Sequence, residues 1–202
     1  MIKLIDYIKD CLNDEEFRIA WEKENSDLDA YIFESHSGLK STHTLTMREA
    51  LNLLNEIGAS ELDSIITNKG IKAKVTASIT TEIIFYEDKN GCPVKDFLTH
   101  IDNKKLKAKT LRNILELAVE GNSAKPPLSV YVDDGIFELR TQQSSNIDRI
   151  FYFFIFGNKI VLTNGYIKKS QKLDKQEFER AKRYRDDYMK KFKGDEQKSQ
   201  FL

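Results

Sequence analysis

Cationic and phenolic side chains lie within runs that otherwise have the composition of buried strands. Arg140 and Arg149 stand among β-branched, aliphatic and aromatic residues, and Lys168 and Lys169 follow an apolar run that ends at Thr163. Burying positive charge is costly unless an anion compensates it. A guanidinium binds two phosphate oxygens at once and keeps its charge at physiological pH. These residues therefore predict a site for a nucleic-acid phosphate backbone.

Each of these residues also has a purely structural alternative. The two arginines could form ion pairs with Glu138 or Asp148 instead. Lys168 and Lys169 point to opposite faces if the strand continues, so only one of them can face a substrate. Tyr166 could stack on a base, or transfer a proton if the neighbouring lysines lower its pKa, but it could equally be an ordinary half-buried strand tyrosine.

Charge is distributed unevenly along the 202 residues. The whole chain has a formal net charge of zero, with 32 Lys and Arg against 32 Asp and Glu. Residues 1–78 carry 9 basic against 14 acidic side chains, whereas residues 79–202 carry 23 against 18. An acidic segment therefore precedes a basic one, and the basic one is the part expected to contact nucleic acid.

The cysteines and the apolar runs of the sequence indicate in which cellular compartment the protein is expected. Cys11 and Cys92 occur without CxxC or Cys/His spacing, so neither a disulfide framework nor a zinc site is predicted. No run approaches the roughly 18 apolar residues of a membrane span, and the N-terminus lacks the apolar core of a signal peptide. We expect a cytoplasmic protein with no membrane contact, no metal and no cofactor.

Helical patterns dominate the N-terminal segment. Apolar residues recur at helical spacing across the first thirty residues, and Asn13-Asp14 can start a second helix there. Further helices are predicted at 46–57 and 60–66. The turn between these two imitates a helix-turn-helix, but the region is acidic, which argues against sequence-specific DNA binding. A small acidic helical unit is therefore expected over residues 1–76.

From residue 79 the pattern changes to short strands and three helices. Alternating or β-branched runs between turn residues predict strands, and amphipathic runs predict helices. The predicted strands are 79–87, 129–132, 136–141, 148–156 and 159–164, and the predicted helices are 94–100, 103–120 and one that begins after Asp174. The predicted fold class is therefore α+β.

Several short motifs in this segment follow one another in the order found in one protein family. They are Ile83-Ile-Phe-Tyr-Glu87, Gly91-x-Pro-Val94, Asp134-Gly-x-x-Glu-Leu-Arg140, Arg149-Ile-x-Tyr152 and Gly165-Tyr-Ile-Lys-Lys-Ser-Gln-Lys172. With these motifs, the block from about Glu82 to Tyr188 resembles the phage-derived subgroup of the RelE/HigB superfamily of type II toxin–antitoxin toxins. Two positions depart from the pattern: Asn164 stands where many relatives have His, and Asp174 where many have Pro.

The resemblance implies both a fold and an activity. The fold is a RelE-like antiparallel sheet packed by helices over residues 79–193, preceded by the antitoxin-like helical unit 1–76. The activity is that of a growth-inhibiting toxin that enters the ribosome and cuts mRNA without a metal, with the RNA supplying its own 2′-OH as nucleophile. Such a reaction needs a base, cations that stabilise the phosphorane, and an acid for the leaving 5′-oxygen.

Site residues are assigned from the matching motifs and from the Lys-rich helix. The catalytic candidates are Arg140, Arg149, Tyr166, Lys168 and Lys169, and the RNA-binding candidates are Asn164, Lys172, Lys105, Lys109 and Arg112. Asn164 can hydrogen-bond a phosphate or a base, but it cannot serve as a general base. The simpler interpretation of the cations on the Lys-rich helix is that they form a solvated face. The simpler interpretation of His36, His43 and His100 is that they are surface histidines without a catalytic role.

The expected partners are mRNA, the ribosome and an antitoxin. Residues 6–22 resemble the leader helix of antitoxins paired with such toxins, so the antitoxin is a cognate helix-turn-helix protein or this chain's own N-terminal segment. That segment is expected to pack on the toxin-like domain and lower its activity. The contacts would come from Leu4, Ile8, Phe17 and Trp21. The alternative function is a catalytically weak or self-inhibited relative that acts as a binding or regulatory module.

Overall fold

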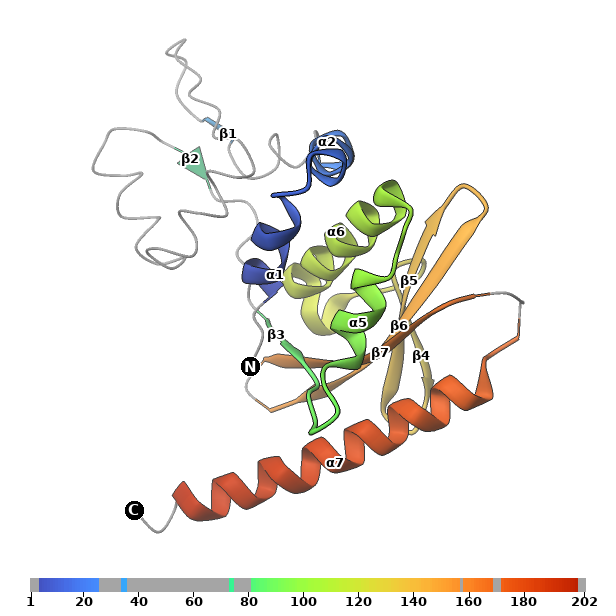
Figure 1. Cartoon of the computed structure of the whole chain (residues 1–202). Coiled ribbons are helices and arrows are strands. Elements are labelled where there is room, and N and C mark those ends of the chain that lie inside the picture. The colour runs from blue at the N-terminus through green and yellow to red at the C-terminus, as the bar shows by residue number, and fades with distance from the viewer. Residues whose placement is uncertain are drawn as a thin grey trace.

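The fold is α+β, with a five-stranded sheet between two layers of helices (Figure 1). The computed structural model describes residues 4–25, 34–35, 73–74, 81–156, 158–168 and 172–199. The described helices are α1 (Leu4–Cys11), α2 (Glu15–Glu24), α5 (Pro93–Thr99), α6 (Lys104–Glu120), the short 3-10 helix η1 (Gly121–Ser123) and α7 (Lys175–Ser199). The strands are β1 (Glu34–Ser35), β2 (Ala73–Lys74), β3 (Glu82–Phe85), β4 (Ser129–Asp133), β5 (Ile136–Gln143), β6 (Asn146–Ile155) and β7 (Lys159–Ile167).

The main sheet has the strand order β3-β7-β6-β5-β4. The four strands β4 to β7 form an antiparallel meander, whereas β3 pairs with β7 in parallel, with Ile84 opposite Val161. A parallel pair needs a long crossover, and α5, α6 and the first three strands of the meander supply it. The sequence therefore predicted the antiparallel character correctly, with β3 as the exception.

Turn residues fix the register of the meander. At the β4–β5 turn Asp134 and Gly135 have φ angles of 52° and 72°, the positive pair that a tight two-residue hairpin requires. Ser144 and Asn158, at the next two turns, also have positive φ. These connections place β5, β6 and β7 side by side with their central residues in line.

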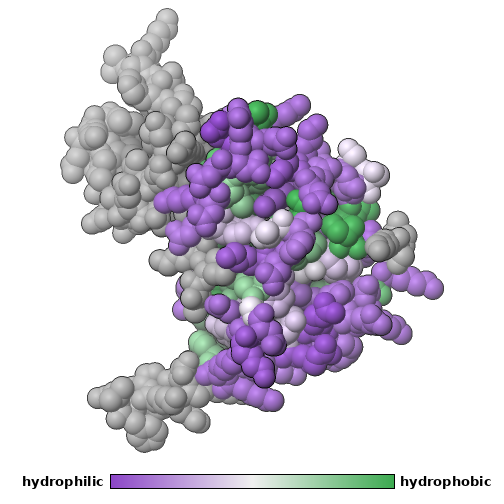
Figure 2. Space-filling model, in the orientation of Figure 1, coloured by the Kyte–Doolittle hydropathy of each residue, from purple (hydrophilic) through white to green (hydrophobic). Residues whose placement is uncertain are grey.

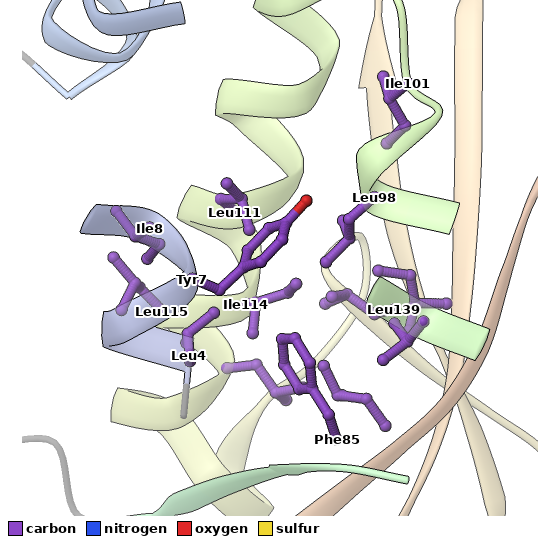
Figure 3. Packing of buried hydrophobic residues seen from close by; sticks show 14 of the residues in the cluster. Leu4, Tyr7, Ile8, Phe85, Leu98, Ile101, Leu111, Ile114, Leu115 and Leu139 are labelled. Carbon is purple, nitrogen blue, oxygen red and sulfur yellow. The ribbon is translucent and has the colours of Figure 1, made fainter. Parts of the chain in front are cut away.

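The helices α1 and α2 share one hydrophobic core with α5, α6 and one face of the sheet. Leu4, Ile8, Phe17 and Trp21 are each buried to 5% exposure or less. Figure 3 shows Leu4, Tyr7 and Ile8 of α1 directed toward the apolar face of α6. The expected contact between these N-terminal residues and the following domain is thus confirmed for the described helices.

Helix α7 covers the opposite face of the sheet. Phe178 and Ala181 are buried against Ile136 and Phe151. The ring of Tyr184 stacks on that of Tyr86, with centroids 4.6 Å apart, farther along the helix. The sheet therefore separates α7 from α1, α2, α5 and α6 (Figure 1).

The predicted strands and helices from residue 81 onward all occur, with ends that differ by a few residues. The predicted helices 46–57 and 60–66 lie outside the described residues. In the described part of the chain, no helix is long and apolar enough to cross a membrane. Figure 2 shows that most of the described surface on the viewed face is hydrophilic.

Candidate functional site

Three strands place the chemically active residues in one row across the sheet. Arg140 on β5 is opposite Arg149 on β6, and Arg149 is opposite Tyr166 on β7. In the adjacent row Glu138 is opposite Phe151, and Phe151 is opposite Asn164. Since side chains two residues apart on a strand point to the same face, both rows lie on the face that α7 partly covers.

The carboxylate of Glu138 lies at the centre of this arrangement. Its side chain is 1% exposed, and its Oε1 accepts a hydrogen bond from Arg140 Nε at 2.8 Å. Arg149 Nε is 3.0 Å from the same oxygen in poor hydrogen-bond geometry, so that contact is ionic. The Tyr166 hydroxyl donates to Oε2 at 3.2 Å. One acid therefore holds two guanidinium groups and one phenol.

Of the two predicted ion-pair partners, Glu138 is the one that the arginines use. Arg149 Nη1 donates to the backbone oxygens of Asp148, at 2.6 Å, and Thr141, at 3.3 Å. The Asp148 side chain points to the other face, where its Oδ2 accepts from Thr110 Oγ1 at 2.5 Å. Burial raises the pKa of Asp148 to about 6.

The site shifts the pKa values of its proton carriers. Burial and the neighbouring Glu138 carboxylate raise the pKa of Tyr166 above its ordinary value. The alternative in which neighbouring cations lower the pKa of this phenol is therefore wrong, because desolvation and the carboxylate outweigh the lowering effect of Arg149. Burial lowers the pKa of Lys168. The Glu138 carboxylate opposes this shift, and the charges of Arg149 and Arg140 add to it. Tyr166 is thus held as a neutral donor, and Lys168 is brought closer to a neutral amine.

Lys168 extends the row at the end of β7. Its backbone N–H donates to Ile147 O at 2.8 Å, which continues the strand ladder by one residue. Lys168 therefore shares a face with Tyr166, two residues earlier, and its amine is within electrostatic reach of Glu138. Lys169 lies outside the described residues.

Asn164, which was predicted to bind RNA, is buried and bonds to Glu177 of α7 instead. Its side chain is 2% exposed and donates to the Glu177 carboxylate at 2.8 Å and to the Glu177 backbone oxygen at 3.2 Å. Thr163 Oγ1 donates to the Asn164 side-chain oxygen at 3.0 Å. Asn164 therefore fixes the first turn of α7 to the sheet, and its amide group is already bonded within the protein.

The first turn of α7 supports the ring of Tyr166. Asp174 caps the helix by accepting hydrogen bonds from the N–H groups of Gln176 and Glu177, at 3.1 and 3.2 Å, so the helix starts after Asp174 as predicted. Phe178 packs on Phe151, and Phe151 stacks on Tyr166 with ring centroids 5.6 Å apart. The helix entry therefore determines how firmly the phenol is held.

Gly165 allows α5 to approach the sheet directly behind the row. A Cβ atom added to Gly165 would lie 2.1 Å from Cδ1 of the Phe97 ring. No side chain fits at this position without displacing the ring. The need for glycine between Asn164 and Tyr166 is therefore steric.

Some cations of α6 contact the N-terminal helices, and others are exposed or partly exposed to solvent. Arg112 Nη1 donates to the backbone oxygen of Glu24 at 2.5 Å, so α2 engages this side chain. Lys104 pairs with Asp14 at 2.5 Å, and Lys107 lies over the rings of Tyr7 and Phe17. The N-terminal helices thus contact one basic face of α6. The two other predicted RNA-binding cations of this helix are Lys105, which is exposed, and Lys109, which is partly exposed.

The remaining predicted residues are scattered. Lys172 is exposed just before α7. His100 is exposed at the end of α5, with its Nδ1 2.7 Å from Asp96 O. His36 and His43 lie outside the described residues. No group of three metal-binding side chains occurs within the described ranges.

Glu138 is the functional candidate that sequence reasoning considered only as an ion-pair partner. Its signal was its position two residues before Arg140, which places both charges on one strand face. A carboxylate in an otherwise apolar strand needs buried partners. That requirement could have been used to predict the cluster.

Comparison with known families supports the resemblance for part of the chain. Residues 96–186, fewer than half of the 202, match the family described as Phage derived protein Gp49-like (DUF891). This family belongs broadly to the RelE/HigB-like toxin families. The matched segment includes every described residue of the row. No curated protein sequence matches the chain.

Proposed function

We propose that residues 79–193 act as a toxin that cuts mRNA on the ribosome through attack by the RNA 2′-OH. The observation that supports this is the cluster on β5, β6 and β7. Arg140 and Arg149 contact the carboxylate of Glu138 there, and Lys168 lies within its electrostatic reach. The excess positive charge favours a phosphate ligand. The Gp49-like match supports the toxin assignment.

Each member of the cluster has a role that fits its surroundings. Arg140, with a side chain 39% exposed, binds the scissile phosphate first, and Arg149, 11% exposed, stabilises the charge that develops on its oxygens. Lys168 has a lowered pKa and is the base assigned to the 2′-OH proton. Tyr166 keeps its proton and donates it toward the leaving 5′-oxygen. Glu138 orients the two guanidinium groups.

Expression of the full chain tests this proposal. The wild-type chain should arrest bacterial growth and produce new mRNA 5′ ends inside coding regions. Arg140→Ala should lower the cleavage rate by about 10²–10³-fold, the usual loss when one donor to a transition-state oxyanion is removed. Arg183→Ala, on the exposed face of α7, is the matched control and should cleave normally. Equal cleavage by both variants would refute the assignment.

The second candidate is a self-inhibited relative that binds RNA or ribosomes without cutting. Its supporting observations are the pairing of both arginines with Glu138 and the cover that α1 and α2 give to one face of α6. These helices lie on the other face of the sheet from the row, so the described part of the N-terminal segment does not cover the row itself. A full chain that is harmless to cells yet binds RNA would favour this candidate.

A further inference from the structure

A groove runs from the row along the outer edge of β5. It has a volume of about 1080 Å³, and Arg140 and Arg149 line it together with residues of α6 and of the 123–128 loop. Sites that enclose small molecules usually measure about 300–1000 Å³. The groove is therefore large enough for a nucleotide and is continuous with the proposed phosphate site.

The edge of β5 is open there because β4 is short. The first β4 pair is Ser129 with Leu139, and the backbone N–H of Arg140 makes one further bond, to Leu128 O at 2.8 Å. Beyond this point α6 replaces the missing strand, with Asn113 Nδ2 donating to Arg140 O at 3.0 Å. Gln142 follows on the open edge, with an exposed side chain.

Charge differs between the two ends of the groove. Lys109 lies one helical turn before Asn113 on α6, whereas Glu116 and Glu120 lie one and two turns after it. Lys125 of the 123–128 loop also lines the groove, and its charge offsets that of one of the two glutamates. Thr110, next to Lys109, bonds the side chain of Asp148. Since Asp148 pairs with Thr141, the N-terminal turns of α6 lie toward the Gln142 end of β5. A phosphate is repelled from the glutamates and attracted toward Lys109.

We propose that the Lys109 end of this groove binds the nucleotide of single-stranded RNA next to the scissile phosphate, and that Gln142 reads its base. This inference rests on the proposed function, because Arg140 and Arg149 hold the phosphate from which the strand enters the groove. Lys109 supplies the cation for the flanking phosphate. The primary amide of Gln142 offers both a donor and an acceptor to a base edge. Among the described residues this amide makes one hydrogen bond, to Ser144 O at 3.3 Å, which is long and easily exchanged.

Binding of short single-stranded RNA by the full chain tests the phosphate contact. Fluorescence anisotropy is measured over a range of salt concentrations for wild type, Lys109→Ala and Lys95→Ala. Lys95 is an exposed lysine of α5 outside the groove and is the matched control. Loss of one phosphate contact on a single strand lowers the salt slope by about 0.7, so Lys109→Ala should show this change and Lys95→Ala should not.

Base reading is tested with labelled RNA homopolymers. Gln142→Ala should change the ratio of the tightest to the weakest homopolymer affinity by about tenfold, within the range expected for one lost base contact. Gln143→Ala, whose side chain alternates to the other face and does not line the groove, should leave the ratio unchanged. Unchanged salt slope and unchanged ratio in the groove variants, or no RNA binding at all, would overturn the groove assignment.

The two proposals fail in different ways. If RNA binding depends on Lys109 and Gln142 but the wild-type chain does not cut mRNA, the groove stands and the ribonuclease assignment is wrong. If the chain cuts mRNA while binding and base preference are indifferent to both residues, the ribonuclease assignment stands and the groove is wrong. Both readouts use the full chain.

Discussion

Replacing Glu138 by Gln removes the carboxylate that pairs with both arginines of the row, while the side chain keeps nearly the same shape. At 3.0 Å and an effective dielectric constant of about 20, one ion pair is worth about 5 kcal/mol before desolvation of the acid is subtracted. Breaking a buried ion pair generally costs about 3–5 kcal/mol of folding stability. We therefore expect Glu138→Gln to destabilise the chain by about 3 kcal/mol, because Arg149 is left buried without a counter-ion.

Thermal unfolding followed by circular dichroism measures this change. For a chain of this size 1 kcal/mol shifts Tm by about 2–4 °C, so the variant should melt about 10 °C below the wild type. Added sulfate should recover more of Tm in the variant than in the wild type, since the two guanidinium groups then lack their shared carboxylate. Glu22→Gln, at an exposed position of α2, is the control and should change little.

Two outcomes of this experiment would contradict the proposed anion site. If Glu138→Gln melts with the wild type, the carboxylate does not stabilise the buried arginines. If it melts lower but sulfate raises both proteins equally, the loss comes from packing and the row is not an anion site. In either case the roles proposed for Arg140 and Arg149 would have to be withdrawn.

Other substitutions test separate parts of the structure. Asp148→Asn should flatten the pH dependence of stability. The folded-state pKa of about 6 lies above the unfolded value of 3.8, so the wild type loses about 2 kcal/mol relative to the variant as pH rises from 4 to 6.5. Equal changes of the urea midpoint with pH in both proteins would contradict this. Gly165→Ala should cost about 1–3 kcal/mol in urea unfolding through the clash with Phe97, and an unchanged midpoint would show that the ring moves freely. Trp21→Ala should cost about 3–5 kcal/mol in the same assay, whereas a separately folding N-terminal unit would give a first unfolding step of its own. Tyr166→Phe should slow RNA cleavage about as much as Tyr166→Ala if the hydroxyl donates a proton, and retention of the rate by the Phe variant alone would assign the ring a stacking role.

The meander and its helices could be predicted because their signals are local. The Asp134-Gly135 turn, the apolar alternation of β5 and β6, and the Asp174 cap each determine structure within a few residues. Arg140, Arg149 and Tyr166 followed from cationic and phenolic side chains in strands. That these three residues lie in one row could not be predicted, because it depends on the register between the strands. The two hairpins fix this register, but the sequence spacing alone left it open.

Contacts between distant segments were harder to predict. The parallel pairing of β3 and the bond from Asn164 to Glu177 depend on how the whole chain closes, which no local pattern encodes. Asn164 was assigned to RNA because it stands where many relatives have His and its amide can hydrogen-bond a phosphate or a base. The structure buries it under α7 instead. Glu138 was considered only as a salt-bridge partner because one buried acid serving three groups cannot be recognised before those groups are placed together.

The parallel pairing of β3 with β7 also determines the order in which parts of the sheet can form during synthesis. The apolar residues of β3 emerge early, but Val161, the partner of Ile84, follows 77 residues later, and Ala181 of α7 twenty residues after that. At a synthesis rate of about 5–20 residues per second, about 5–20 s pass between the synthesis of β3 and that of Ala181. For most of this interval β3 has no partner strand. Because Tyr166 lies on β7 and Lys168 directly follows that strand, the row of arginines, phenol and lysine is complete only after β7 has been synthesised.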